Sequence, residues 1–125
     1  MTGGFVDLFG AMKVRAEGAG KARLCVDSHA GLGNISGNVH GGFLLALVDQ
    51  ALFVGPEMSG IAILGGVTID VTSQFLAAVV IGPPIEVVTE VLRETGRMLF
   101  VRGQIEQDWQ AKLAFSGTLR KPDRR

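Results

Sequence analysis

The segment that decides the fold is NISGNVHGGFLLALVDQALFV, residues 34–54. Its first part is rich in Asn, Ser and Gly, which predicts a loop, and the rest is an apolar run long enough for a helix. The only acidic residue in that run is Asp49. A buried carboxylate is costly unless another group compensates for it. The sequence therefore predicts that Asp49 is buried although the helix has no structural need of it. Asp49 is for this reason the first candidate for a catalytic residue.

We expect the helix to begin near His40 and to end at Gly55-Pro56, because proline disfavours helical backbone in the residue before it. The apolar run also raises the question of a membrane span. Asp49 at its middle would cost roughly 2.5–3.5 kcal/mol in a bilayer, so a helix inside a globular core is favoured. No signal peptide is visible at the N-terminus. We expect a cytoplasmic protein that does not contact membranes.

The chain on both sides of this helix has the patterns of short elements. Helical spacing of apolar residues predicts a short amphipathic helix over 5–12 that ends near Gly10, and the composition of 27–38 predicts a loop. The turns at 94–97 and 108–110 are short, which implies an antiparallel meander. Strands are expected over 12–17, 22–26, 61–64, 67–76, 85–93, 98–107 and 111–119.

Composition limits both the fold and the partners. A length of 125 residues predicts one domain over 1–125 with a frayed, charged tail at 120–125. Twelve basic and twelve acidic residues cancel, which argues against nucleic acid or an anionic membrane as a partner. The single Cys25 excludes an internal disulfide and fits a reducing compartment.

One long helix and several antiparallel strands predict an α+β fold with the sheet wrapped around the helix. The helix is apolar on nearly all sides, and a chain of this length cannot cover all of them. We therefore expect an obligate oligomer.

The residues His40-Gly41-Gly42 fall where the first-turn N–H groups of the helix have no partners within the helix. Two glycines weaken a helix there, but they let a ligand approach the backbone closely. This pattern is typical of a site for an oxygen atom that carries negative charge. A tight corner between loop and helix is the alternative interpretation.

Asp49 lies nine residues after His40, so it faces the opposite side of the helix and lies roughly 13 Å further along. One helix cannot direct its own first-turn amides and Asp49 at one small group. Two helices paired across a two-fold interface can, because Asp49 of one copy then meets the Gly41 end of the other.

Other site types are disfavoured. The glycine-rich residues 31–37 have one residue too many for a dinucleotide fingerprint. His29 and His40 are the only histidines, and no carboxylate shares a helical face with His40, so a metal site is not expected.

The motif residues together resemble the hotdog-fold acyl-CoA thioesterases of the PaaI-like (phenylacetate-degradation) group, over nearly the whole chain. The resemblance implies hydrolysis of acyl-CoA to a carboxylic acid and coenzyme A without a cofactor, by a homodimer that often assembles into a homotetramer. The residues that carry it are Asn34, Gly37, His40-Gly41-Gly42, Leu47-Val48-Asp49-Gln50, Gly66-Val67-Thr68-Ile69-Asp70 and Gln74-Phe75-Leu76.

The resemblance also implies a role for each site residue. Asp49 would attack the thioester carbonyl or activate the attacking water, and the Gly41 N–H would hold the oxyanion. Asn34 would place the carbonyl or the water, and His40 would fix the loop near the thioester. Thr68 would orient the water or Asp49.

Substrate-binding residues are less defined. Gly42 is expected beside Gly41, and Arg97 is a candidate for the coenzyme A phosphates, as are Arg93 and Arg102; solvated strand charges are the alternative. A non-catalytic acyl-CoA-binding module remains the second hypothesis, although it would have no need of Asp49. Residues expected to shape the acyl pocket are Phe43, Leu47, Phe53, Met58 and Phe75.

Overall fold

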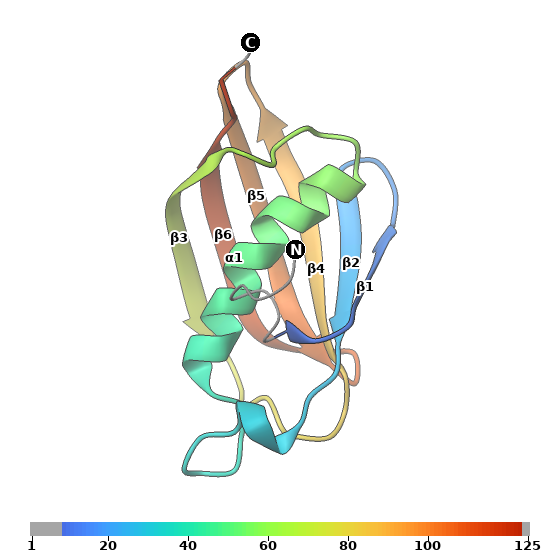
Figure 1. Ribbon diagram of the computed structural model, residues 1–125, viewed down its shortest axis with the longest axis vertical. Coiled ribbons are helices and arrows are strands. Elements are labelled where there is room, and N and C mark those ends of the chain that lie inside the picture. Colours follow the sequence, from blue (N-terminus) through green and yellow to red (C-terminus); the bar gives the residue numbers. More distant parts are fainter. Residues whose placement is uncertain (1–8, 124–125) are drawn as a thin grey trace.

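The computed structural model describes residues 9–123, which form one long helix and a six-stranded sheet (Figure 1). The helix is α1 (Gly41–Met58), and a short 3-10 helix, η2 (Ala30–Leu32), precedes it. The strands are β1 (Met12–Ala16), β2 (Lys21–Val26), β3 (Val67–Phe75), β4 (Ile85–Glu94), β5 (Met98–Gln107) and β6 (Gln110–Arg120).

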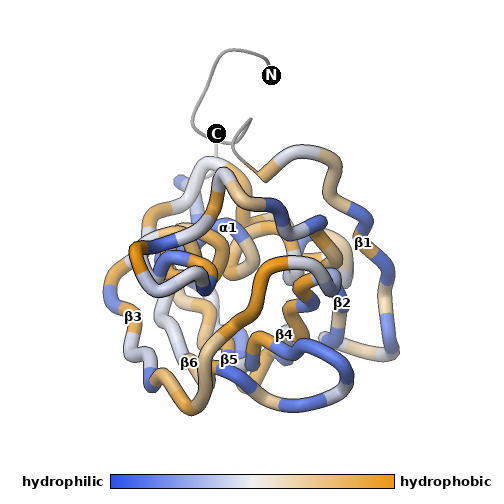
Figure 2. Tube along the Cα trace, turned by 90° about the horizontal axis from the view of Figure 1, so that it is seen from below, coloured by the Kyte–Doolittle hydropathy of each residue, from blue (hydrophilic) through white to orange (hydrophobic). Residues whose placement is uncertain are grey.

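The strand order in the sheet is β1-β2-β4-β5-β6-β3, and every neighbouring pair is antiparallel. Figure 2 shows the sheet curving around α1, with β3 at one edge and β1 at the other. Strands β4, β5 and β6 form the expected meander. The predicted α+β class, an antiparallel sheet around one long helix, is therefore confirmed.

The core lies between α1 and the inner face of the sheet. Buried residues Leu44, Leu47, Val48, Ala51 and Leu52 form the inward side of the helix. They recur three or four positions apart, which is the spacing of one helical face.

Contact between α1 and β4 is especially close near the end of the helix. A Cβ atom added to Gly55 would lie 2.1 Å from Oγ1 of Thr89. Only glycine therefore lets the helix approach the strand this closely.

The prediction that the helix ends at Gly55-Pro56 is wrong, because α1 continues to Met58. Proline normally clashes with the Cβ atom of the preceding residue, but Gly55 has none. Pro56 has no N–H, so it cannot donate to the Leu52 carbonyl four residues earlier. The Ser59 and Ile61 N–H groups donate to the Pro56 carbonyl.

The strand expected over 61–64 is also absent from the described chain. The Ile63 N–H donates to the Glu57 carboxylate, and the Ile63 carbonyl accepts from Gly66. These bonds close a turn after the helix, with Gly65 at φ +92°. Ile63 itself is buried, so its apolar character serves the core and not a strand.

The chain termini and the loop before α1 differ partly from expectation. Most of the helix expected over 5–12 lies outside the described residues, and Met12 belongs to β1. The loop over 27–38 contains η2. The expected tail begins later than 120, because Arg120 is in β6 and the Lys121 N–H donates to the Arg97 carbonyl at 2.7 Å. Within residues 9–123, no helix combines the length and apolar character needed to cross a membrane.

Candidate active site

One backbone N–H at the N-terminus of α1 has no partner within residues 9–123. The His40 carbonyl accepts from Phe43 and Leu44, at 3.0 and 3.2 Å. Nδ1 of the His40 ring accepts from the Gly42 N–H at 2.9 Å. The Gly41 N–H has no hydrogen-bond partner among the described residues. Since the helix dipole places partial positive charge here, Gly41 offers a single donor to an incoming anionic oxygen.

The two glycines have different surroundings. A Cβ atom on Gly42 would lie 3.1 Å from Nδ1 of His40, so this glycine makes room for the capping ring. A Cβ atom on Gly41 would meet only the edge of the Phe75 ring, at 3.4 Å. The Gly42 N–H is already engaged by His40, and its predicted contact with substrate stays a prediction.

Asn34 holds the loop before the helix through its side-chain oxygen. Oδ1 accepts from the N–H groups of Ser36 and Asn38, at 2.9 and 3.1 Å. Nδ2 has no partner within residues 9–123 and is available as a donor. A hollow of about 600 Å³ opens beside it. The lining residues are Gly33, Asn34, Ile35, Ser36 and His40.

Asp49 is joined to β3 through Thr68, whose Oγ1 donates to Oδ1 of Asp49 at 2.9 Å. A bulge makes this contact possible: the register with β6 passes from Thr68 opposite Leu119 to Asp70 opposite Thr118, which leaves Ile69 as the extra residue. Residues two apart normally share a face of a strand, and a bulge changes the face. Thr68 therefore faces α1, whereas Asp70 faces the other side of the sheet.

The prediction that Asp49 is buried is wrong for the single chain, where it is exposed. The physical reason is that the sheet covers only one side of α1. Gly42, Leu45 and Asp49 lie along the uncovered side. The chain by itself brings Asp49 to Thr68 but not to Gly41.

Arg97 lies in a basic hollow of about 610 Å³ between the β4–β5 turn and the end of β6. Lys121 pairs with Glu94 there, while Arg97 and Arg120 have no ion pair within the described chain. Sequence reasoning missed Arg120 and Lys121, because they had been assigned to a tail. The lining residues are Ala62, Glu94, Gly96, Arg97, Arg120, Lys121, Pro122 and Asp123.

Of the other two arginine candidates, Arg102 pairs with Glu90 at 2.9 Å on the sheet face away from α1. Arg93 follows a bulge near the end of β4 and is exposed. Within residues 9–123, no group of three or more His, Cys, Asp or Glu side chains is arranged to hold a metal ion.

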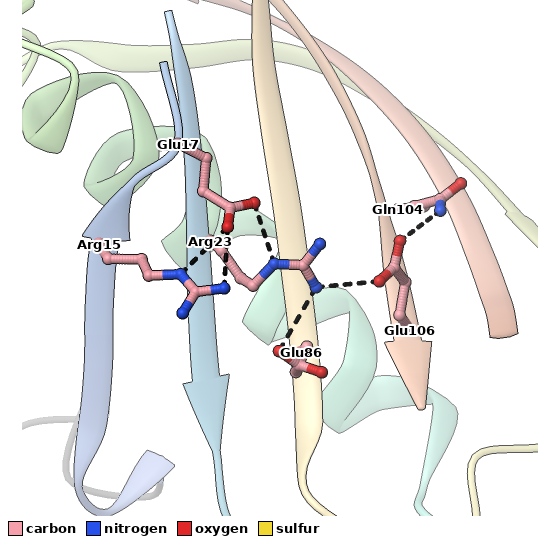
Figure 3. Close-up of polar contacts among 6 residues, drawn as sticks. All are labelled: Arg15, Glu17, Arg23, Glu86, Gln104 and Glu106. Carbon is pink, nitrogen blue, oxygen red and sulfur yellow. Dashed lines mark hydrogen bonds and ion pairs between the residues drawn. The ribbon is translucent and has the colours of Figure 1, made fainter. Parts of the chain in front are cut away.

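A second polar cluster lies on the sheet face away from α1 (Figure 3). Nη1 of Arg23 contacts Glu106 at 3.0 Å and Glu86 at 3.3 Å, and Nε contacts Glu17 at 3.0 Å. Desolvation acts to lower the pKa of Arg23, but hydrogen bonds to Glu106 and Glu17 raise it overall. The bond from Arg23 is the main cause of a lowered pKa at Glu17. Since its charges pair with one another, this cluster is a structural element and not a second reactive site.

Several solved structures share this architecture. Conserved protein PA5202 from Pseudomonas aeruginosa is 26% identical, with a TM-score of 0.77 over 97% of this chain and 95% of that one. A hypothetical thioesterase with coenzyme A from Streptococcus pneumoniae TIGR4 is 19% identical, with a TM-score of 0.81 over 94% and 93%. The PaaI protein of the E. coli phenylacetic acid degradation operon is 19% identical, with a TM-score of 0.81 over 94% and 83%. The fold is thus the hotdog fold of PaaI-like proteins.

A model of the Thioesterase superfamily matches residues 36–114, from the loop before α1 into β6. The chain belongs to the Thioesterase superfamily. A comparison with curated proteins gives no match.

Proposed function

We propose that the protein is an acyl-CoA thioesterase that acts as a homodimer and needs no cofactor. The observation that carries this proposal is the unpaired Gly41 N–H at the start of α1, together with the Asp49 carboxylate held by Thr68. These supply the two groups that thioester hydrolysis requires, an oxyanion donor and a base or nucleophile.

The edge strand β3 supports the dimer. It has nine residues, its outer edge is unpaired among the described strands, and Val67, Ile69, Val71 and Phe75 are all exposed. A long apolar edge strand is a template for pairing with another chain. A second copy of this chain would present the same strand, with the same length and the same exposed residues, as the pairing partner.

Antiparallel pairing of two β3 strands would also assemble the site. Thr68 meets Asp49 near the start of β3, whereas Phe75 meets Gly41 at its end, seven residues or roughly 23 Å further along the strand. Antiparallel pairing brings the start of one strand beside the end of the other. Asp49 of one copy would then approach Gly41 of its partner, and the two-fold axis would generate two such sites.

In the proposed reaction, the thioester carbonyl oxygen accepts from the Gly41 N–H, and Nδ2 of Asn34 is a second donor nearby. Asp49 either takes a proton from water as it attacks the carbonyl carbon or attacks that carbon itself. When Asp49 acts as a base, the proton that it took from water passes to sulfur as the C–S bond breaks, so the carboxylic acid and the thiol form together. When Asp49 attacks the carbon, the C–S bond breaks to leave a mixed anhydride, which water then hydrolyses to the carboxylic acid; the remaining proton goes to the coenzyme A thiolate and Asp49 returns to its carboxylate. Thr68 orients Asp49, and His40 fixes the first turn of α1.

The basic hollow around Arg97 supports coenzyme A as the leaving group. Arg97 and Arg120, which have no ion pair within the described chain, suit phosphate oxygens, and Arg120 lies opposite Val67 at the start of β3. In the proposed dimer this hollow belongs to the copy that supplies Asp49. The similar Streptococcus pneumoniae protein was solved with coenzyme A.

The test is hydrolysis of a panel of acyl-CoAs, followed with a thiol-detecting reagent. Asp49→Asn should retain the fold and lower turnover by about 10²–10⁴, the contribution of a general base. Asp70→Asn is the matched control, because this carboxylate lies two residues from Thr68 on the other face of β3; it should retain activity. Near-wild-type hydrolysis by Asp49→Asn would end the proposed role of Asp49. Binding of acyl-CoA by wild type without any hydrolysis would favour a non-catalytic acyl-CoA-binding module.

Sedimentation measurements test the dimer separately. Val71→Lys places a charge at the centre of the exposed edge and should shift the protein toward monomer, with loss of turnover. A fully active monomer would contradict the shared site.

A further inference from the structure

Five residues were expected to shape the acyl pocket, and Phe75 is the one that lies against Gly41. Its ring edge is 3.4 Å from the position of a Cβ atom on Gly41, and 55% of the residue is exposed. Leu47 is fully buried in the core. Phe43 packs against Phe9, with ring centroids 5.5 Å apart. Neither has the open position beside Gly41 that Phe75 has.

The backbone on both sides of Phe75 is fixed. Phe75 is the last residue of β3 and lies opposite Leu113, which is buried, so its side chain is on the α1 side of the sheet. The next two N–H groups, of Leu76 and Ala77, both donate to the Lys112 carbonyl, at 2.9 and 3.1 Å. The backbone that carries the ring is therefore anchored to β6.

We propose that Phe75 determines specificity by limiting the bulk of the acyl group at the carbon next to the thioester carbonyl. This inference rests on the proposed function. When the carbonyl oxygen accepts from the Gly41 N–H, the carbonyl carbon lies within about 4 Å of that nitrogen, and its substituents reach the ring. The sulfur atom carries no branch. The ring therefore discriminates among substrates through branching at the acyl α-carbon.

The test compares butyryl-CoA with isobutyryl-CoA, which have the same number of carbon atoms and differ only in the α-branch. Wild type should prefer the linear substrate in kcat/KM. Phe75→Ala should shift the ratio toward isobutyryl-CoA by about 10-fold or more, the scale at which one methyl group is discriminated in an apolar pocket. Val71→Ala is the matched control, because Val71 is on the same face of β3 but roughly 13 Å away. It should leave the ratio unchanged.

A binding measurement separates this inference from the proposed function. Ketone analogues of the linear and the branched thioester cannot be hydrolysed. Calorimetry with these analogues gives the preference for the linear over the branched acyl group as a ratio of dissociation constants. If the analogues bind but neither thioester is hydrolysed, the thioesterase proposal is overturned, and the binding ratio still tests Phe75. An unchanged ratio in Phe75→Ala, or in Phe75→Leu if the alanine variant does not fold, would overturn the role of Phe75 alone. Failure of the linear analogue to bind wild type would overturn both.

Discussion

Replacement of Arg23 by methionine is expected to destabilise the fold strongly at neutral pH. The Arg23 side chain is only 13% exposed and lies among the carboxylates of Glu17, Glu86 and Glu106. Glu86 and Glu106 are directly opposite each other in the β4–β5 register, and like charges in that position repel. Methionine retains much of the aliphatic volume of arginine but removes the charge between them.

The magnitude follows from burial. Glu106 is 10% exposed at its side chain, and without Arg23 its remaining side-chain partner is Gln104. Removal of one member of a buried pair costs about 3–5 kcal/mol, and the partial exposure of Glu86 and Glu17 favours the lower end, about 3 kcal/mol. Loss of the contact with the Trp109 ring, 5.1 Å from the guanidinium carbon, adds about 0.5–1 kcal/mol.

The pH dependence has a definite sign. The pKa of Glu17 is lowered, chiefly by its hydrogen bond with Arg23. A lowered carboxyl pKa contributes stability that is fully present above the ordinary value, about 4.3, and is lost as the pH falls through the folded-state value. Arg23→Met lacks this contribution. The difference in unfolding free energy between wild type and variant should therefore shrink between pH 7 and pH 3.

The assay is urea unfolding followed by circular dichroism at pH 7 and at pH 3. Both proteins are compared at one concentration, because an oligomer's stability depends on it. Arg15→Met is the control: Arg15 also pairs with Glu17, but its side chain is 65% exposed, so at most about 1 kcal/mol is expected. An Arg23→Met loss below 1 kcal/mol at pH 7, or an equal loss at both pH values, would refute the reasoning.

Two further predictions concern the loop before α1 and the contact between helix and sheet. Asn34→Asp should leave the loop intact, because a side-chain oxygen still accepts from Ser36 and Asn38. It should lower kcat by at least about 10-fold, because negative charge replaces the Nδ2 donor near the oxyanion. A wild-type kcat would show that Asn34 only shapes the loop. Gly55→Ala should destabilise the protein by about 1–3 kcal/mol in urea unfolding, because the added methyl group meets Oγ1 of Thr89. Thr89→Ala, added to Gly55→Ala, should recover part of this loss. The absence of any recovery would assign the loss to another contact.

Much of the fold could be predicted from local patterns. The bounds of the strands from Ile85 onward were expected to within one or two residues, because alternating apolar residues and short turns are properties of the chain over a few residues. The start of the helix at the His40 cap followed from the same kind of local signal. Pro56 and Ile63 misled the prediction, because Gly55 removes the usual steric clash with the proline and the Glu57 carboxylate accepts from the Ile63 N–H outside any strand.

The sequence by itself determined the residue types of the candidate site: an acid in an apolar helix, two glycines after a histidine, and an asparagine in the loop. Only the tertiary structure decided how they are used. The bulge at Ile69 turns Thr68 toward Asp49, and the end of β3 brings Phe75 to Gly41. Helices and strands follow from interactions within a few residues of the chain, whereas these contacts depend on the register of a whole sheet.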